Sequence, residues 1–230
     1  MSARFTLFLD ADDTLWENNV YFERAIEHFY QLVAPAGGDR AAMRARINAH
    51  ERRVIAEIGY GLASFTLALT RAFQDLAPER WNPEAADAVA ELAARIAEEP
   101  IELVPEAETT LRDLATRHRL VLMTKGDYAE QTRKVELSGL QPLFEQVHVV
   151  PEKTAAAYRA RVAGLAAAPA ACWMIGNSPK SDINPALEAG LNAVLIPHPW
   201  TWVLEQDAVA PRPGRQFLQL ERLADLRRHF

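Results

Sequence analysis

The second half of the chain alternates short apolar runs with helical patterns, and this alternation constrains the fold more than any other feature. The apolar runs lie at 119–124, 146–150, 172–176 and 192–197, and amphipathic stretches alternate with them at 106–117, 127–138, 154–167 and 179–189. Strands that alternate with helices are typical of a parallel sheet with helices on both faces. We therefore predict an α/β fold whose core is a doubly wound, Rossmann-like parallel sheet.

A further apolar run, at 4–10, stands apart from the others at the beginning of the chain. The sequence after it has helical periodicity, in four amphipathic stretches at 22–33, 43–58, 62–76 and 85–96. Four such helices with short connections predict a helical module. We therefore predict two domains: an α/β core formed by 1–15 and 102–230, and an inserted helical cap domain formed by 16–101.

The composition is that of a soluble globular protein with ample core material. Of the 230 residues, 49% are hydrophobic and 24% are charged, and the formal net charge is −6. This negative charge argues against a general nucleic-acid binder. No apolar stretch approaches the length of a membrane span, and the single Cys172 fits a reducing compartment. We expect a cytoplasmic protein with no nucleic-acid or membrane partner, and protein partners stay open.

A dense cluster of acids ends the first apolar run. Asp10, Asp12 and Asp13 lie within the stretch FLDADDTLW. Carboxylates this close repel one another and are costly to bury without a cation. Asp182 follows the run at 172–176, and the carboxyl ends of parallel strands meet at one ligand crevice. A hard divalent cation such as Mg²⁺ binds carboxylates and would offset these charges.

The lysines are unevenly placed in this sequence. Of the 25 basic residues only four are lysines, and Lys125, Lys153 and Lys180 follow predicted strands. In a chain that otherwise uses arginine, a compact ammonium at these places favours contact with phosphate or carboxylate. Thr124 ends one strand, and the backbone N–H groups of Lys125 and Gly126, where a helix begins, suit a phosphate oxygen.

In this order, the motifs resemble those of the haloacid dehalogenase-like superfamily, in its phosphatase branch. The first family motif, an apolar strand followed by Asp-x-Asp-x-Thr, is matched by Asp10, Asp12 and Thr14. The remaining three motifs are matched by Thr124, by Lys153 and by the segment from Gly176 to Asp182. The resemblance covers the whole chain and implies an α/β core with a helical cap inserted after the first motif.

What this resemblance implies is a Mg²⁺-dependent phosphatase that acts on a small phosphomonoester through an aspartyl phosphate. Asp10 would attack phosphorus, and Asp12 would protonate the leaving group and later activate water. The metal ligands would be Asp10, Asp182 and the backbone carbonyl of Asp12. Thr124 and Lys153 would hold the phosphoryl oxygens, and Lys125 is a further candidate for phosphate binding.

One departure from the family pattern concerns the metal site. Many members have Asp directly after the glycine of the fourth motif, whereas this chain has Asn177. The neutral amide of Asn177 would orient a metal-bound water, and Asp182 would remain a direct ligand.

Each of these motifs also has a structural interpretation. Asp12, Asp13 and Thr14 also fit a helix cap or an Asx-turn, and Asp13 is interpreted as structural. The segment 178–182 also fits a helix start, and Lys153 also fits a solvated lysine. The histidines are scattered without ligand spacing, which argues against a histidine metal site. The aromatic loop at 197–202 either borders the crevice or packs.

The substrate is left open, because the cap would determine it. The stretch GYGLASF at 59–65 offers a turn between two cap helices, and Tyr60 and Trp16 are the candidates for substrate contacts. Tyr60 also fits a residue packed inside the cap. The competing functions are metal-independent 2-haloacid dehalogenation, phosphoryl transfer to a sugar hydroxyl as in mutases, and a non-catalytic regulatory role.

Overall fold

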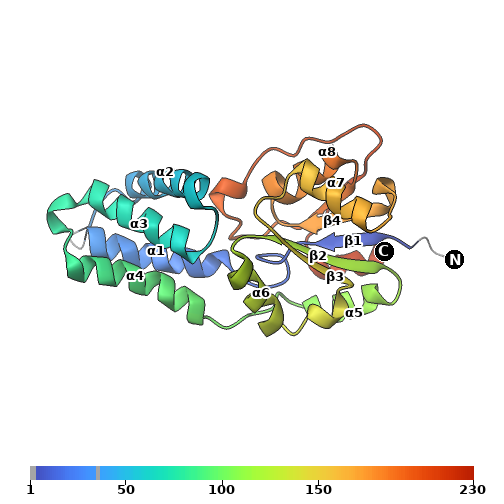
Figure 1. Cartoon of the computed structure of the whole chain (residues 1–230), viewed down its shortest axis with the longest axis horizontal. Coiled ribbons are helices and arrows are strands. Elements are labelled where there is room, and N and C mark those ends of the chain that lie inside the picture. Colours follow the sequence, from blue (N-terminus) through green and yellow to red (C-terminus); the bar gives the residue numbers. More distant parts are fainter. Residues whose placement is uncertain (1–3, 35–36) are drawn as a thin grey trace. The chain divides into compact units, whose positions relative to one another are not determined.

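The sheet is built from the apolar runs, and its strands are all parallel. The computed structural model describes residues 4–34 and 37–230. Within these residues the sheet has six strands in the order β3-β2-β1-β4-β5-β6 (Figure 1). The strands are β1 (Thr6–Leu9), β2 (Arg119–Lys125), β3 (Gln146–Val150), β4 (Cys172–Gly176), β5 (Asn192–Leu195) and β6 (Phe217–Gln219). The predicted doubly wound α/β fold is confirmed, with β1 between β2 and β4.

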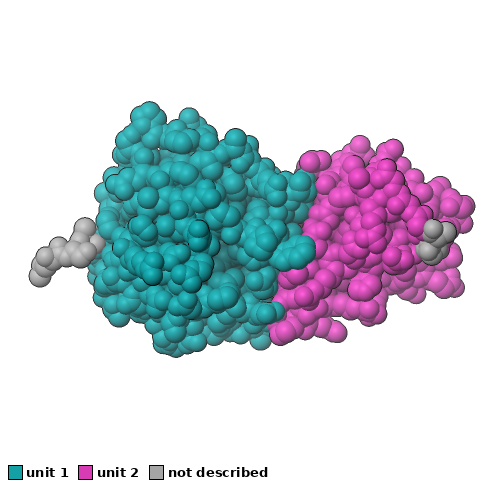
Figure 2. All heavy atoms as spheres, turned by 180° about the vertical axis from the view of Figure 1, so that it is seen from behind, with its two compact units in different colours: residues 1–19, 101–230 teal, residues 20–100 magenta. Residues whose placement is uncertain are grey.

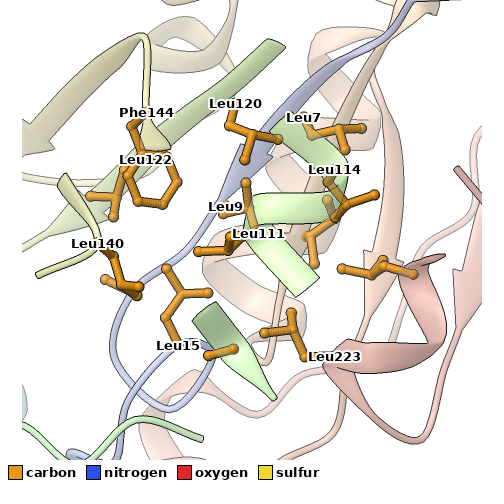
Figure 3. Packing of buried hydrophobic residues seen from close by; sticks show 14 of the residues in the cluster. Leu7, Leu9, Leu15, Leu111, Leu114, Leu120, Leu122, Leu140, Phe144 and Leu223 are labelled. Atoms are coloured by element: carbon orange, nitrogen blue, oxygen red, sulfur yellow. The ribbon is translucent and has the colours of Figure 1, made fainter. Parts of the chain in front are cut away.

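Alternation along the strands divides the core of the sheet into two layers. Successive side chains of a strand point to opposite faces. Leu7 and Leu9 of β1 pack with α5 (Ala107–Ala115) and α6 (Tyr128–Leu137), in the cluster that Figure 3 shows. Phe8 packs on the other face with residues of α7 (Ala155–Gly164) and α8 (Asn184–Ala189). Figure 1 shows these helix pairs on opposite sides of the sheet.

The helix predicted at 179–189 is present, but its first turn is wider than an α-helical turn. A wide π-helical turn, Pro179–Ile183, precedes α8, and Ser178 caps this turn by accepting the N–H of Ser181 on its side chain. The turn carries Asp182. The short strand β6 and the 3₁₀ turn Leu223–Arg228 near the C-terminus are elements that the sequence patterns did not predict.

The chain divides into two compact units, coloured in Figure 2. Unit 1 comprises residues 1–19 and 101–230, and unit 2 comprises 20–100. These boundaries lie close to those of the predicted domains at 16–101. None of the helices among the described residues has the length and apolar character needed to cross a bilayer.

The residues of unit 2 are almost entirely helical and build their own core. The helices are α1 (Asn19–Val33), α2 (Arg40–Ile58), α3 (Leu62–Leu76) and α4 (Pro83–Glu98), and the four predicted helices are therefore present. Phe29 of α1 and Phe73 of α3 stack edge to face at 6.1 Å between ring centroids. The turn between α2 and α3 has φ angles of +84° at Gly59 and +132° at Gly61, which favour glycine.

Candidate active site

Asp10 lies in unit 1, directly after the central strand β1, and its carboxylate is buried. The Thr14 hydroxyl donates to Asp10 Oδ2 at 3.0 Å. Thr14 reaches Asp10 because the chain turns back at once, with the N–H of Leu15 bonded to the carbonyl of Ala11 at 2.8 Å. The chain therefore makes a tight turn directly after β1, and this turn holds the carboxylate of Asp10 at the C-terminal ends of the strands.

Asp13 is the structural member of the acid cluster. Its φ of +59° is left-handed, a conformation that Asp tolerates better than most residues. Its carboxylate accepts the backbone N–H groups of Asn18 at 2.9 Å and Asn19 at 3.0 Å, at the start of α1. Burial, together with the charges of Asp12 and Asp10, raises the pKa of Asp13 to about 7 against the opposing hydrogen bonds. Asp13 thus has a structural role, as predicted, and this role is to cap the start of α1.

Lys153 connects two of the predicted site carboxylates. Its Nζ atom bonds Asp10 Oδ1 and lies 2.7 Å from Asp182 Oδ1, and its side chain is only 2% exposed. Burial by itself lowers the pKa of Lys153, but the two carboxylates outweigh that effect and raise the pKa above its usual value. This burial excludes the alternative of a solvated lysine.

Asp182, on the π-helical turn that follows β4, is fully buried. Its Oδ2 accepts the backbone N–H of Ser178 at 3.0 Å. A Cβ atom at residue 176 would lie 2.2 Å from Asp182 Oδ2, so only glycine there leaves room for the carboxylate. Burial and the charge of Asp10 raise the pKa of Asp182, and Lys153 opposes this shift.

The donor set at this point fits a hard cation. Two buried carboxylates, Asp10 and Asp182, share one ammonium, so the group as a whole carries surplus negative charge. Surplus charge in a buried place is costly, and burial, followed by the charge of Asp10, raises the pKa of Asp182 accordingly. Carboxylate oxygens are the ligands that Mg²⁺ takes in proteins. The Asp12 side chain does not bond to this pair, since other groups hold it.

Three side chains hold the carboxylate of Asp12. The indole N–H of Trp16 donates to Oδ1 at 2.7 Å, and the Gln131 amide donates to Oδ2 at 3.0 Å. Lys134 Nζ lies 3.0 Å from both oxygens. Trp16 itself is fully buried in the core of unit 1. This burial corrects the prediction that Trp16 contacts a substrate, and its role is to bind Asp12.

The residues at the C-terminal end of β2 make hydrogen bonds within the protein. Thr124 donates its hydroxyl proton to Gln131 Oε1 at 3.0 Å. The N–H of Gly126 is bonded to the carbonyl of Val150 at 3.2 Å, which leaves it no role toward a phosphate in this structure. Lys125 Nζ lies 2.6 Å from Glu205 Oε1, so its ammonium contacts a carboxylate, one of the two partners predicted for these lysines, and neutralises a buried acid.

Glu205 is a residue that sequence reasoning missed. It lies on the 3₁₀ turn Val203–Glu205 and accepts the hydroxyl protons of Ser178, at 2.7 Å, and Ser181. Burial by itself raises the pKa of Glu205, but Lys125 and the two hydroxyl donors outweigh burial. The pKa of Glu205 is therefore lower than its usual value. Glu205 thereby fixes the turn that carries Asp182.

The aromatic loop at 197–202, after β5, borders the site. The sequence left open whether this loop borders the site or only packs. The Asn177 amide donates to the Thr201 hydroxyl at 3.0 Å. His198 lies 3.3 Å from Glu17 and 3.8 Å from Asp13, and these three residues have ligand atoms within 4.8 Å of one another. The scattered histidines gave no signal for this cluster. Three such ligand atoms could hold a metal ion, but Asp13 already caps α1, so a structural role explains why these residues lie together.

Comparisons with known proteins agree with this arrangement. The profile of the family described as haloacid dehalogenase-like hydrolase matches residues 6–190. A search of curated proteins finds no match. Among solved structures, a haloacid dehalogenase-like family hydrolase from Xanthomonas campestris is 25% identical, with a TM-score of 0.84, over 99% of this chain and 90% of that one.

Two more distant structures share the fold. The hydrolase YfnB from Bacillus subtilis, solved bound to magnesium, is 17% identical with a TM-score of 0.67, over 99% of each chain. An L-2-haloacid dehalogenase from Xanthobacter autotrophicus is 15% identical with a TM-score of 0.62, over 98% of each chain.

Proposed function

The chain belongs to the haloacid dehalogenase-like hydrolases, and from that premise we propose that it is a Mg²⁺-dependent phosphatase acting on a small phosphomonoester. The observation that carries the proposal is the second acid of the first motif. Asp12 follows the buried Asp10 by two residues, and three side chains hold its carboxylate. Phosphate ester hydrolysis needs such an acid for the leaving group, whereas displacement of a halide does not.

In the first step of this mechanism, a carboxylate oxygen of Asp10 forms a bond to phosphorus while the bond to the leaving oxygen breaks. Asp12 gives its proton to that oxygen. In the second step, Asp12 takes a proton from water, and this water attacks phosphorus and displaces the Asp10 carboxylate. The products are the alcohol and inorganic phosphate, and covalent catalysis has divided one difficult hydrolysis into two steps.

The remaining site residues would bind the phosphoryl group and neutralise its negative charge. Lys153 holds Asp10 in place and offers a positive charge to the phosphoryl oxygens. The Thr124 hydroxyl, which donates to Gln131 in this structure, would have to leave that partner to bind a phosphoryl oxygen. Mg²⁺ would be held by Asp10, Asp182 and the backbone carbonyl of Asp12, with Asn177 orienting a water. When bound, it would supply the positive charge that stabilises the transferring phosphoryl group.

Metal-independent 2-haloacid dehalogenation is the second candidate. A solved L-2-haloacid dehalogenase has the same fold, and that reaction also needs a carboxylate nucleophile placed like Asp10. It needs no acid at position 12 and no cation, so the presence of Asp12 supports phosphorus chemistry instead.

The test compares both reactions in the same preparation. Inorganic phosphate release from a panel of phosphomonoesters is measured with Mg²⁺ and with EDTA, and chloride release from 2-chloropropionate is measured without metal. We expect phosphate release that requires Mg²⁺, and no chloride release. Chloride release with no phosphatase activity would establish the dehalogenase instead. Asp10→Asn is the control, because its amide is a poor nucleophile of nearly the same shape.

A further inference from the structure

Lys134, the lysine that no family motif assigns, lies on the proposed general acid. We propose that Lys134 is a positioning residue that holds the Asp12 carboxylate for proton transfer, an inference that rests on the phosphatase function proposed above. Its Nζ atom lies 3.0 Å from both oxygens of Asp12 and 2.7 Å from Asn18 Oδ1.

Partial burial strengthens this ion pair. The side chains of Lys134 and Asp12 are 24% and 22% exposed. Fully exposed pairs contribute little, because water screens the charges and both side chains lose entropy. Here the surroundings screen the charges less, and Asn18 accepts a further bond from the same ammonium. The ammonium is therefore fixed from two sides, and it fixes Asp12 in turn.

The helix α6 supplies a second donor to the same carboxylate. Gln131 lies three residues before Lys134, a spacing that puts both side chains on one face of the helix. Its amide nitrogen donates to Asp12 Oδ2, and its amide oxygen accepts the proton of the Thr124 hydroxyl. A Cβ at Gly126 would lie 3.1 Å from this amide, so the glycine leaves the space that the amide occupies. Two residues of α6 thus set the orientation of Asp12.

Orientation matters because a general acid works only within hydrogen-bond reach of the oxygen that it protonates. A small misplacement of a reacting group can cost a large part of the rate. Since the Lys134 ammonium bonds Asp12 and Asn18, it acts on the reaction through Asp12. Its removal is therefore expected to lower the rate most where the leaving group most needs a proton.

The experiment uses two substrates of similar shape, p-nitrophenyl phosphate and phenyl phosphate, with Mg²⁺. Phenolate is the more basic leaving group and depends more on protonation. Lys134→Met is expected to lower kcat for phenyl phosphate by about 10- to 100-fold, the size expected for loss of a charge-assisted hydrogen bond. The loss for p-nitrophenyl phosphate is expected to be smaller, with KM little changed. Lys134→Arg, which keeps the charged donors, is expected to recover most of the rate.

A double-mutant cycle identifies the residue through which Lys134 acts. In an Asp12→Asn background, Lys134→Met is expected to cause no further loss. Arg133→Gln, at the exposed neighbour on the same helix, is the matched control for removal of a positive charge. Lys134→Gln repeats the measurement if the Met variant melts below the assay temperature.

The outcomes separate this inference from the function on which it rests. Equal losses on both substrates, or a loss that adds fully to that of Asp12→Asn, would overturn the role of Lys134 and leave the phosphatase intact. A wild-type protein that releases no phosphate from either substrate would overturn the proposed function, and the role of Lys134 with it.

Discussion

The carboxylate of Asp182 occupies the space where residue 176 would otherwise carry a side chain: a Cβ at Gly176 would lie 2.2 Å from Oδ2 and 2.8 Å from the Asp182 Cβ. Lys153 and the backbone of Ser178 hold this carboxylate, so it has little freedom to move away. Gly176→Ala is expected to displace Asp182, abolish Mg²⁺-dependent turnover and destabilise the fold by about 1–3 kcal/mol through overpacking. Phosphate release measures the loss of turnover, and urea unfolding measures the loss of stability.

Gly164→Ala is the matched control for that variant. Gly164 lies in α7, and nothing lies within 4 Å of a Cβ built there. The alanine is expected to leave activity unchanged and to stabilise the protein by about 0.4–1 kcal/mol, because alanine restricts the unfolded chain. Wild-type activity in Gly176→Ala would show that Asp182 is not needed where the structure places it.

The cap made by Asp13 predicts a contrast between two substitutions. Asn keeps an acceptor for the N–H groups of Asn18 and Asn19 and tolerates the left-handed φ of +59°. Ala keeps neither advantage, so Asp13→Ala is expected to lose about 1–2 kcal/mol of stability and Asp13→Asn much less. Urea unfolding at pH 6 measures the difference, and equal losses would contradict the capping role.

The same carboxyl predicts a pH dependence of stability. Burial raises the pKa of Asp13 from 3.8 to about 7. Between these values the folded protein keeps a proton that the unfolded chain has lost, so this group makes stability fall as pH rises. Over pH 4–7, the wild type is expected to lose stability relative to Asp13→Asn. Parallel stability curves for the two proteins would contradict the raised pKa.

The single cysteine is expected to be chemically inert. Cys172 is fully buried, and burial raises the pKa of its thiol to about 11. Because the thiolate is the reactive form, a thiol reagent at pH 8 is expected to label the native protein only very slowly and the urea-unfolded protein at once. Fast stoichiometric labelling of the native protein would show that Cys172 is accessible.

Substrate choice is proposed to involve Tyr60, which lies between Gly59 and Gly61 in the turn that joins α2 to α3. Tyr60→Ala is expected to change relative activity among phosphomonoesters more than it changes p-nitrophenyl phosphate hydrolysis. Ile58→Ala, at an exposed position beside the turn, is the control. An unchanged substrate profile with a large loss of thermal stability would assign Tyr60 to packing inside the helical unit.

Much of the fold could be predicted from the sequence because each strand and helix buries apolar residues at the regular spacing of that kind of element. Strands such as Cys172–Gly176 are fully buried, so their apolar runs predict them directly. Asp10 and Asp182 follow such strands and Thr124 lies near the C-terminal end of another. Parallel strands end on one side of the sheet, which predicts that the three residues come together. The strand Phe217–Gln219 was missed because it is short and partly exposed, so its sequence carries little periodic signal.

The parts of the site that escaped prediction depend on contacts between distant residues. Lys134 is 122 residues from Asp12 and looks like any lysine on a helix face. Glu205 is 80 residues from Lys125 and lies in a segment without regular periodicity. Trp16 was predicted to contact a substrate, and only its burial shows that it packs in the core. Charge partners of this kind are fixed by tertiary packing, which local patterns do not encode.

The most direct test of the central claim is whether Asp10 carries a phosphoryl group during turnover. The reaction with p-nitrophenyl phosphate and Mg²⁺ is quenched in acid within the first turnover, and the peptide that contains Asp10 is analysed by mass spectrometry. We expect a phosphorylated Asp10 that is absent from Asp10→Asn and absent in EDTA. Phosphate release with Asp10 unmodified, or substantial turnover by Asp10→Asn, would contradict it.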